Sequence, residues 1–394
     1  MGSVPPQKPK VICAVVIAHV PENSSGNTWA FLNWAIGLRA AGLDVWLVEH
    51  LDRAKLAFAP GVTGGESLNE RLWRRIVTEH GFEDRATLFL DDDADSAAAF
   101  TRWAEDADAL VNLSGQFKLH DRVAHLSRRA YVDLDPAFTQ LWAGTLDVDM
   151  NFAGHTHFFS VGSLVASAHL PPTGRKWLPT LSPVSLPHWT SVEDVALPID
   201  PTDCWTTVTH WHGYKTMPWE GRVYGDKRES LVLVRDLPRH GARLLVATDM
   251  QPDWTDYQEF FATGWRFIDA AQISGDMRVY RKFLEASAGE FSVAKQGYVM
   301  SRCGWFSDRS ACYLALGRPV VLQETGWSEV LPSGDGLRAW QTVEEAVEVL
   351  RDFEREPAKH RAAARRIAEE FLDARKVAAT LLRRIGIEPP LREI

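Results

Sequence analysis

Short apolar segments alternate with amphipathic segments along most of this chain, and the alternation runs through the sequence twice. At the beginning, an apolar run at 11–18 leads through a polar loop into a helix-like segment, on which Trp29, Leu32 and Ile36 share one face, and then into a second apolar run at 45–48. Parallel strands need such long crossover connections between them, and these are usually helical. The pattern therefore predicts a doubly wound α/β domain.

The same alternation continues to about residue 132. It predicts helices at 67–79 and 95–106 and strands at 87–90, 109–113 and 130–132. Prolines and turn residues then gather between about 171 and 204, as they do in segments that connect domains. We therefore expect a domain boundary near residue 200.

Beyond this boundary the alternation restarts. It predicts strands at 205–211, 244–247, 265–268, 297–301 and 319–322, helices at 227–237, 254–262, 276–286, 308–316 and 342–352, and terminal helices within 357–385. At 394 residues the chain is also longer than a single hydrophobic core usually grows. We expect an α/β protein with two Rossmann-like domains, 1–200 and 201–394, facing each other across a ligand-binding cleft.

Composition argues against several classes of protein. The formal net charge is −9 and there is no long Lys/Arg run, which argues against nucleic acid as a partner. The apolar run at 11–18 is too short to span a bilayer, so we expect no membrane span and a cytoplasmic location. The cysteines (Cys13, Cys204, Cys303 and Cys312) form no close pair typical of zinc or redox sites. The sequence does not indicate an oligomeric state.

A glycine turn that leads into a helix is the most informative feature of the second half. Gly304 precedes Ser307, a good N-cap residue, and the helix is expected to continue to Gly317. Free amide groups at such a helix start bind anions, and the side chains of Ser307, Arg309 and Ser310 are further donors. Asp308 would oppose an anion there. An ordinary capped helix with an exposed arginine is the alternative interpretation.

In the stretch 289–352 the sequence resembles the group-1-type GT-B glycosyltransferases, in particular the bacterial subgroup related to spore-maturation-type glycosyltransferases. The resemblance lies in a similar G-x-F-S-x-R-x-x-x-x-L-A-x-G-x-P-V-V pattern, while 26–29 and 133–136 look like family features of the first half. It implies a glycosyltransferase whose second domain holds a nucleotide-sugar co-substrate, a UDP- or dTDP-sugar, and whose acceptor is a small or soluble molecule. The family's E-x7-E motif is absent, so the stereochemistry of transfer stays open.

The resemblance also implies roles for individual residues of the second domain. Ser307, Arg309 and Ser310 would face the diphosphate, and the sugar hydroxyls would be reached by Gln323, Glu324, Thr325 and Gly326. Lys295 and Tyr298 precede the anion turn, where related enzymes contact the base and ribose; a surface lysine and a half-buried tyrosine are the alternative. His212 or Lys215, in a loop expected to face the cleft, would neutralise charge on the leaving diphosphate.

Polar residues that follow the strands of the first domain are candidates for the acceptor side. His19 ends the first strand, where inverting GT-B enzymes commonly keep a general base, and a neutral imidazole there can accept the acceptor's proton. Asp135 is a second catalytic candidate, although an aspartate before Pro136 also organises turns. Further expected acceptor contacts are Asn27, Ser114, Gln116 and His155.

The acidic run 91–95 is similar to the metal-binding DxD motif of the other glycosyltransferase fold. It also opens an expected helix, where carboxylates favour the dipole, so we interpret it as a helix start and expect no metal and no other cofactor. Two alternative functions stay open: a nucleotide-sugar epimerase on the same fold, and a non-catalytic nucleotide- or sugar-binding protein. Incubation with the donor alone, followed by product analysis, distinguishes these alternatives.

Overall fold

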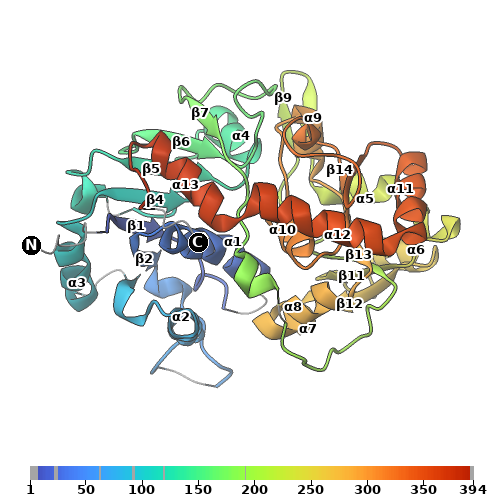
Figure 1. Ribbon diagram of the computed structural model, residues 1–394, viewed down its shortest axis with the longest axis horizontal. Coiled ribbons are helices and arrows are strands. Elements are labelled where there is room, and N and C mark those ends of the chain that lie inside the picture. The colour runs from blue at the N-terminus through green and yellow to red at the C-terminus, as the bar shows by residue number, and fades with distance from the viewer. Residues whose placement is uncertain are drawn as a thin grey trace, which may run out of the picture.

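The computed structural model describes residues 8–21, 25–61, 64–90, 94–118, 120–190 and 192–390. It contains two parallel sheets, one in each half of the chain (Figure 1). The predicted pair of doubly wound domains is confirmed.

The first sheet has seven parallel strands in the order β3-β2-β1-β4-β5-β6-β7. They are β1 (Lys10–Ala14), β2 (Asp44–Leu51), β3 (Ala86–Leu90), β4 (Ala109–Leu113), β5 (Arg129–Asp133), β6 (His157–Ser160) and β7 (Trp177–Pro179). The helices of this half are α1 (Ser25–Ala40), α2 (Leu68–Glu79), α3 (Ala94–Ala104) and α4 (Phe138–Thr145), with short 3₁₀ turns η1 (Arg53–Lys55), η2 (Glu83–Arg85), η3 (His120–Val123) and η4 (Leu186–Trp189).

The second sheet has six parallel strands in the order β12-β11-β8-β13-β14-β15. They are β8 (Trp205–Thr209), β11 (Leu244–Thr248), β12 (Arg266–Asp269), β13 (Gly289–Ser292), β14 (Val320–Gln323) and β15 (Leu337–Trp340), and a separate antiparallel hairpin consists of β9 (Met217–Trp219) and β10 (Arg222–Tyr224). The helices are α5 (Lys227–Leu233), α6 (Thr255–Phe261), α7 (Ala270–Ser274), α8 (Met277–Ala286), α9 (Gln296–Ser301), α10 (Asp308–Ala315), α11 (Val343–Arg355) and α12 (Pro357–Ile367), with 3₁₀ turns η5 (Leu237–His240) and η6 (Trp327–Glu329).

Both sheets have the strand order of a Rossmann fold. Counted along the chain, the six strands of the second sheet follow the order 3-2-1-4-5-6, and the first sheet has this order with one strand added. The order reverses between β1 and β4 and between β8 and β13. Ligands of open parallel sheets bind beyond the carboxyl ends of the strands at such reversal points. The topology therefore predicts a ligand site in the loops after these four strands.

The last helix of the chain returns to the first domain. α12 is followed by a π-helical turn (Ala368–Leu372) and by α13 (Ala374–Arg384), and α13 packs against α1 (Figure 1). Gly37 of α1 lies so close to it that a Cβ there would be 2.5 Å from the carbonyl oxygen of Ala374. The two sheets lie on either side of the boundary expected near residue 200, but the terminal helices are divided between the domains.

One expected strand is wrong. Residues 297–301 belong to the helix α9, and the strand of this region is β13, which lies earlier in the chain. The pattern misled because the apolar run Tyr298–Met300 looks strand-like, whereas β13 carries the fully buried polar residues Glu290 and Ser292. The short strands β6, β7 and β15 were not expected either.

Candidate active site

A cavity of about 390 Å³ lies between the two domains. The first domain contributes residues that follow β1, β4 and β5, and the second contributes Tyr214, Trp305 and Asp308. We call it the central cavity. It occupies the position that the strand order of the first sheet indicates.

A second cavity, of about 290 Å³, adjoins the central one and is lined by Lys227 and Arg309. Its wall also includes the carboxyl end of β8 and the first turn of α1, and it shares Asn27 and Asp308 with the central cavity. We call it the cationic cavity. It lies at the reversal point of the second sheet, so the cavities at the two reversal points are neighbours.

Lys227 is a half-buried lysine whose hydrogen-bond partner is a neutral hydroxyl. Its Nζ donates a hydrogen bond of 2.7 Å to the hydroxyl of Thr209. Burial, followed by the charges of Arg309 and Lys295, lowers the pKa of Lys227 to about 7. An anion in the cavity would offset these penalties, so Lys227 and Arg309 together suit a phosphate or diphosphate. No motif in the sequence indicates Lys227 as a site residue. Its position at the start of an expected helix is the only feature that could have suggested it.

Arg309 is fixed in the wall of the cationic cavity. Its Nε donates to Glu290 Oε1 at 2.6 Å, and its two terminal nitrogens donate to the Val208 carbonyl at 2.7 Å and to Ser292 Oγ at 2.9 Å. Burial alone would lower the pKa of Arg309, but the carboxylate of Glu290 outweighs it and raises the pKa. The guanidinium therefore stays charged beside the cavity.

The two serines of the anion turn do not line the cationic cavity. Ser310 is fully buried, and its hydroxyl donates to Glu290 Oε2 at 2.5 Å. Ser307 is the N-cap of α10 and is also buried, without a side-chain capping bond. Ser310 thus helps to orient Glu290, the partner of Arg309, and its hydroxyl is not directed into the cavity.

The loop after β14 is engaged within the second domain. The side chain of Gln323 accepts from the Ala294 amide at 3.0 Å, the hydroxyl of Thr325 donates to the Trp305 carbonyl at 2.7 Å, and Glu324 accepts from the amide of Gly326. Gly326 needs its positive φ of 99° for this turn. None of these four residues lines either cavity. The contact with sugar hydroxyls that the resemblance implied for them thus has no support in this geometry.

Asp135 links the two domains. It accepts hydrogen bonds from the hydroxyls of Tyr214 and Tyr298, and Lys295 Nζ lies 3.1 Å from its Oδ1 and 3.5 Å from the centre of the Tyr214 ring. Lys295 and Tyr298 were expected at the base and ribose of the donor, but their polar groups are directed at Asp135. Tyr214, which no motif indicated, forms a wall of the central cavity.

Asp135 is itself oriented by a buried carboxylate. Asp133 accepts from the hydroxyls of Thr139 at 2.7 Å and Ser160 at 2.9 Å, and from the Asp135 amide at 2.9 Å. Burial raises the pKa of Asp133, although these hydrogen bonds oppose the shift. The carboxylate thus fixes the loop after β5.

Five of the residues expected on the acceptor side line the central cavity: His19, Asn27, Ser114, Gln116 and Asp135. Partial burial and the charge of Lys55 lower the pKa of His19, so its ring is neutral at pH 7. The sixth, His155, lies outside the cavity, with its ring 5.3 Å from that of Tyr131.

A buried carboxylate holds the loop that carries His19. Oε2 of Glu49 accepts from the amides of Ile17 at 2.7 Å and Ala18 at 2.8 Å, and burial raises the pKa of this carboxyl to about 7. No motif singles out Glu49, which lies within the second strand, β2.

His212 and Lys215 are exposed and line neither cavity. The ring of His212 lies 5.8 Å from that of Trp254 instead. The expected contact of either side chain with a leaving diphosphate has no support in this arrangement.

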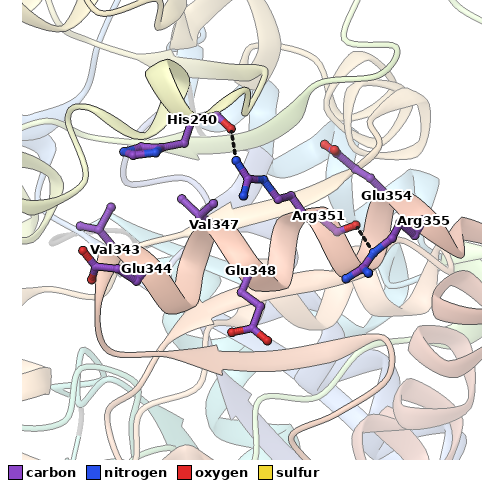
Figure 2. Close-up of a pocket in the computed structure, with 8 residues that line it drawn as sticks. All are labelled: His240, Val343, Glu344, Val347, Glu348, Arg351, Glu354 and Arg355. Atoms are coloured by element: carbon purple, nitrogen blue, oxygen red, sulfur yellow. Dashed lines mark hydrogen bonds between the residues drawn. The ribbon is translucent and has the colours of Figure 1, made fainter.

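A larger hollow, of about 780 Å³, lies elsewhere, along α11 (Figure 2). It is formed by side chains of one helix and by His240, whose carbonyl accepts from Arg351 at 3.2 Å. It lies at no strand reversal point and receives nothing from the first domain. We therefore assign no active site to it.

Within the described ranges, no group of three or more His, Cys, Asp or Glu side chains is arranged to hold a metal ion. The aspartates at 91–93 lie outside the described residues. The described helices include none that is long and apolar enough to cross a membrane.

No described protein family matches this sequence, and no curated protein is similar to it. Several solved structures are similar in fold. The Anabaena protein HepE, in complex with UDP and glucose, is 11% identical with a TM-score of 0.57 over 96% of this chain and 99% of its own. An α-glucosyltransferase in complex with UDP and a 13-mer DNA is 10% identical with a TM-score of 0.56, covering 96% of this chain and 100% of its own.

A glycosyltransferase from Rickettsia africae is 13% identical, with a TM-score of 0.52 over 96% of this chain and 98% of its own. All three comparisons therefore include both domains and the cleft. At such low identities the likeness concerns the fold, not the reaction. The chain thus has the two-domain GT-B fold that its C-terminal pattern predicted.

Proposed function

We propose that this protein is a glycosyltransferase that transfers a sugar from a nucleoside-diphosphate sugar to a small or soluble acceptor. The observation that carries the proposal is the pair of half-buried cations, Lys227 and Arg309, in a cavity that adjoins the central cavity between the domains. Among UDP- and dTDP-sugars we favour UDP-sugars, because HepE and the α-glucosyltransferase compared above are in complex with UDP.

The diphosphate of the donor would lie between Lys227 and Arg309, facing the starts of α1 and α10. Charge accumulates on the diphosphate as the bond to the sugar breaks, and fixed cations and helix dipoles in a cavity with little water stabilise that charge. A small acceptor would bind in the central cavity against Asn27, Ser114 and Gln116. The net charge of −9 favours such an acceptor over nucleic acid, which one of the compared enzymes binds.

For the acceptor's proton we propose His19, which lines the central cavity as a neutral ring. We assign Asp135 a positioning role, because its oxygens already accept hydrogen bonds from Tyr214, Tyr298 and Lys295. We also propose, on the sequence pattern alone, that the protein belongs with the spore-maturation-type subgroup and works in the cytoplasm.

The affinity for UDP is expected to depend on the charge of Lys227. The pKa of this side chain is about 7, so the free protein carries the charge below pH 7 and loses it above. A bound diphosphate favours the charged form and raises the pKa. Calorimetric titration with UDP should therefore show an affinity that falls by up to about tenfold per pH unit above pH 7.

Two variants and a control test this assignment. Lys227→Arg keeps its charge at every pH and should bind UDP with a flat pH profile, whereas Lys227→Met should weaken binding by about 10–100-fold at pH 6. Lys215→Met, at an exposed lysine outside both cavities, is the control and should bind as the wild type does. The assignment is wrong if Lys227→Met retains wild-type affinity, and the proposed function fails if the wild type binds no UDP at all.

Turnover is expected to need no divalent cation, since Lys227, Arg309 and the helix starts can stabilise the departing diphosphate. Release of UDP from the donor should continue at an unchanged rate in EDTA. Loss of turnover in EDTA that manganese or magnesium restores would instead point to the acidic run at 91–95. The same assay without acceptor separates the alternatives, because an epimerase converts the donor sugar and a binding protein leaves it intact.

A further inference from the structure

Of the described residues, Asn27 and Asp308 alone line both the central and the cationic cavity. If the diphosphate lies in the cationic cavity and the acceptor in the central one, the sugar between them must lie against these two residues. The inference below rests on the proposed function in this respect.

Asp308 is the first residue of α10 and is half-buried. Burial raises the pKa of its carboxyl, while the charges of Arg309 and Lys227 and the amides at the helix start oppose the shift. No described side chain forms an ion pair or a hydrogen bond with it. An acidic residue that only complemented the helix dipole would gain nothing from a position in a cavity, and a carboxylate beside a diphosphate weakens the binding of that diphosphate.

We propose that Asp308 and Asn27 form the subsite for the donor sugar, and that Asp308 selects an uncharged or amino sugar over a uronic acid. The carboxylate of Asp308 accepts hydrogen bonds from two neighbouring sugar hydroxyls. Asn27 is held in the same two walls by the hydrogen bond of 2.7 Å that its Nδ2 donates to the Val16 carbonyl, and its side-chain oxygen is a further acceptor for the sugar.

The chemistry of a carboxylate explains both the affinity and the selection. It offers only acceptors, and a pair of adjacent hydroxyls presents two donors to it. A donor sugar with its own carboxylate would place a like charge in a partly dehydrated cleft, where repulsion is much stronger than in water. Gln323 and Glu324, which the family pattern suggested for the sugar, are occupied by the amides of Ala294 and Gly326 and line neither cavity.

Asp308 is expected to weaken the binding of UDP and to strengthen the binding of a neutral donor sugar. Because these effects on affinity have opposite signs, replacing Asp308 can be told apart from a general loss of structure. Without the carboxylate, UDP itself should bind more tightly, because repulsion of the diphosphate is gone. The additional affinity from a neutral sugar should decrease at the same time. A residue that merely stabilised α10 would weaken every ligand alike when replaced.

The experiment is calorimetric titration with UDP, UDP-glucose and UDP-glucuronate. The wild type should bind UDP-glucose about tenfold or more tightly than UDP-glucuronate. The affinity of Asp308→Asn for UDP should exceed that of the wild type by a factor of about three or more. Its preference for UDP-glucose over UDP-glucuronate should be smaller than that of the wild type by a factor of about five or more. Asp308→Ser, which also suits a helix start, is a second variant in case the first does not fold.

Glu344→Gln is the matched control, because Glu344 is an exposed acidic residue in the first turn of α11, outside the cleft. It should leave all three affinities unchanged. Equal binding of UDP-glucose and UDP-glucuronate by the wild type, or an unchanged preference in both Asp308 variants, overturns the subsite while the proposed function stands. If the wild type binds none of the three ligands, both proposals fail.

Discussion

Replacement of His19 by alanine is expected to lower the rate of transfer by about 10²–10⁴-fold while the affinity for UDP changes little. His19 follows β1, lines the central cavity and lies outside the cationic cavity. Its lowered pKa keeps the ring neutral at pH 7, in the form that accepts a proton. In the wild type the rate should rise with pH through the pKa of His19 and then level off, because the protonated ring cannot act as the base.

The measurement pairs this rate with the stereochemistry of the product. A general base is required when the configuration at the anomeric carbon inverts, so the product should be examined by NMR alongside the kinetics of His19→Ala. His212→Ala is the control, since His212 is exposed and lines neither cavity. Retention of configuration, or a rate for His19→Ala near that of the wild type, would leave His19 with a structural role.

Replacement of Glu290 by alanine is expected to lower the free energy of unfolding by about 3–5 kcal/mol. Glu290 is fully buried, and it pairs with Arg309 at 2.6 Å and accepts from Ser310 at 2.5 Å. Without it, a buried guanidinium keeps only the Val208 carbonyl and Ser292 Oγ as partners. Removal of one partner from a buried ion pair costs far more than the pair itself contributes.

Urea denaturation measures this loss, and the slope of the transition should stay that of the wild type. The control is Glu329→Ala, which breaks the exposed pair between Arg302 and Glu329 (2.8 Å) and should cost less than about 1 kcal/mol. A similar small loss for Glu290→Ala would mean that Arg309 finds solvent or another acceptor. The same reasoning applies to Arg309→Ala, which leaves Glu290 unpaired and so mixes lost stability with lost binding. Lys227 is therefore the cleaner probe of the anion site.

The alternating pattern of the sequence was sufficient to predict both doubly wound domains, because strands buried on both faces read as apolar runs. The pattern failed to predict a buried strand whose polar side chains are paired with a charged side chain of another element. β13 contains Glu290 and Ser292, whose polarity is compensated by Arg309 from α10. A pattern along one strand contains no information about a partner on another element.

The candidate site was predictable on the acceptor side and less so on the donor side. His19, Asn27 and Ser114 follow strands or begin a helix, and the carboxyl ends of parallel strands meet at one edge of a sheet. Ser310 belongs to the anion pattern, yet its hydroxyl is directed at Glu290, because a sequence pattern does not give the direction of a side chain. Lys227 joins Arg309 only through the packing of the second domain, so no local pattern indicates it.

The first domain is completed by a segment that leaves the ribosome after the whole second domain. α13 (Ala374–Arg384) covers α1, and the two helices share the main hydrophobic core. During synthesis this apolar face of α1 is therefore open to water while the second sheet already has all its strands. The first domain is therefore synthesised first but completes its fold last. A chaperone that binds exposed apolar surface would find its target on this face of α1 in the nascent chain.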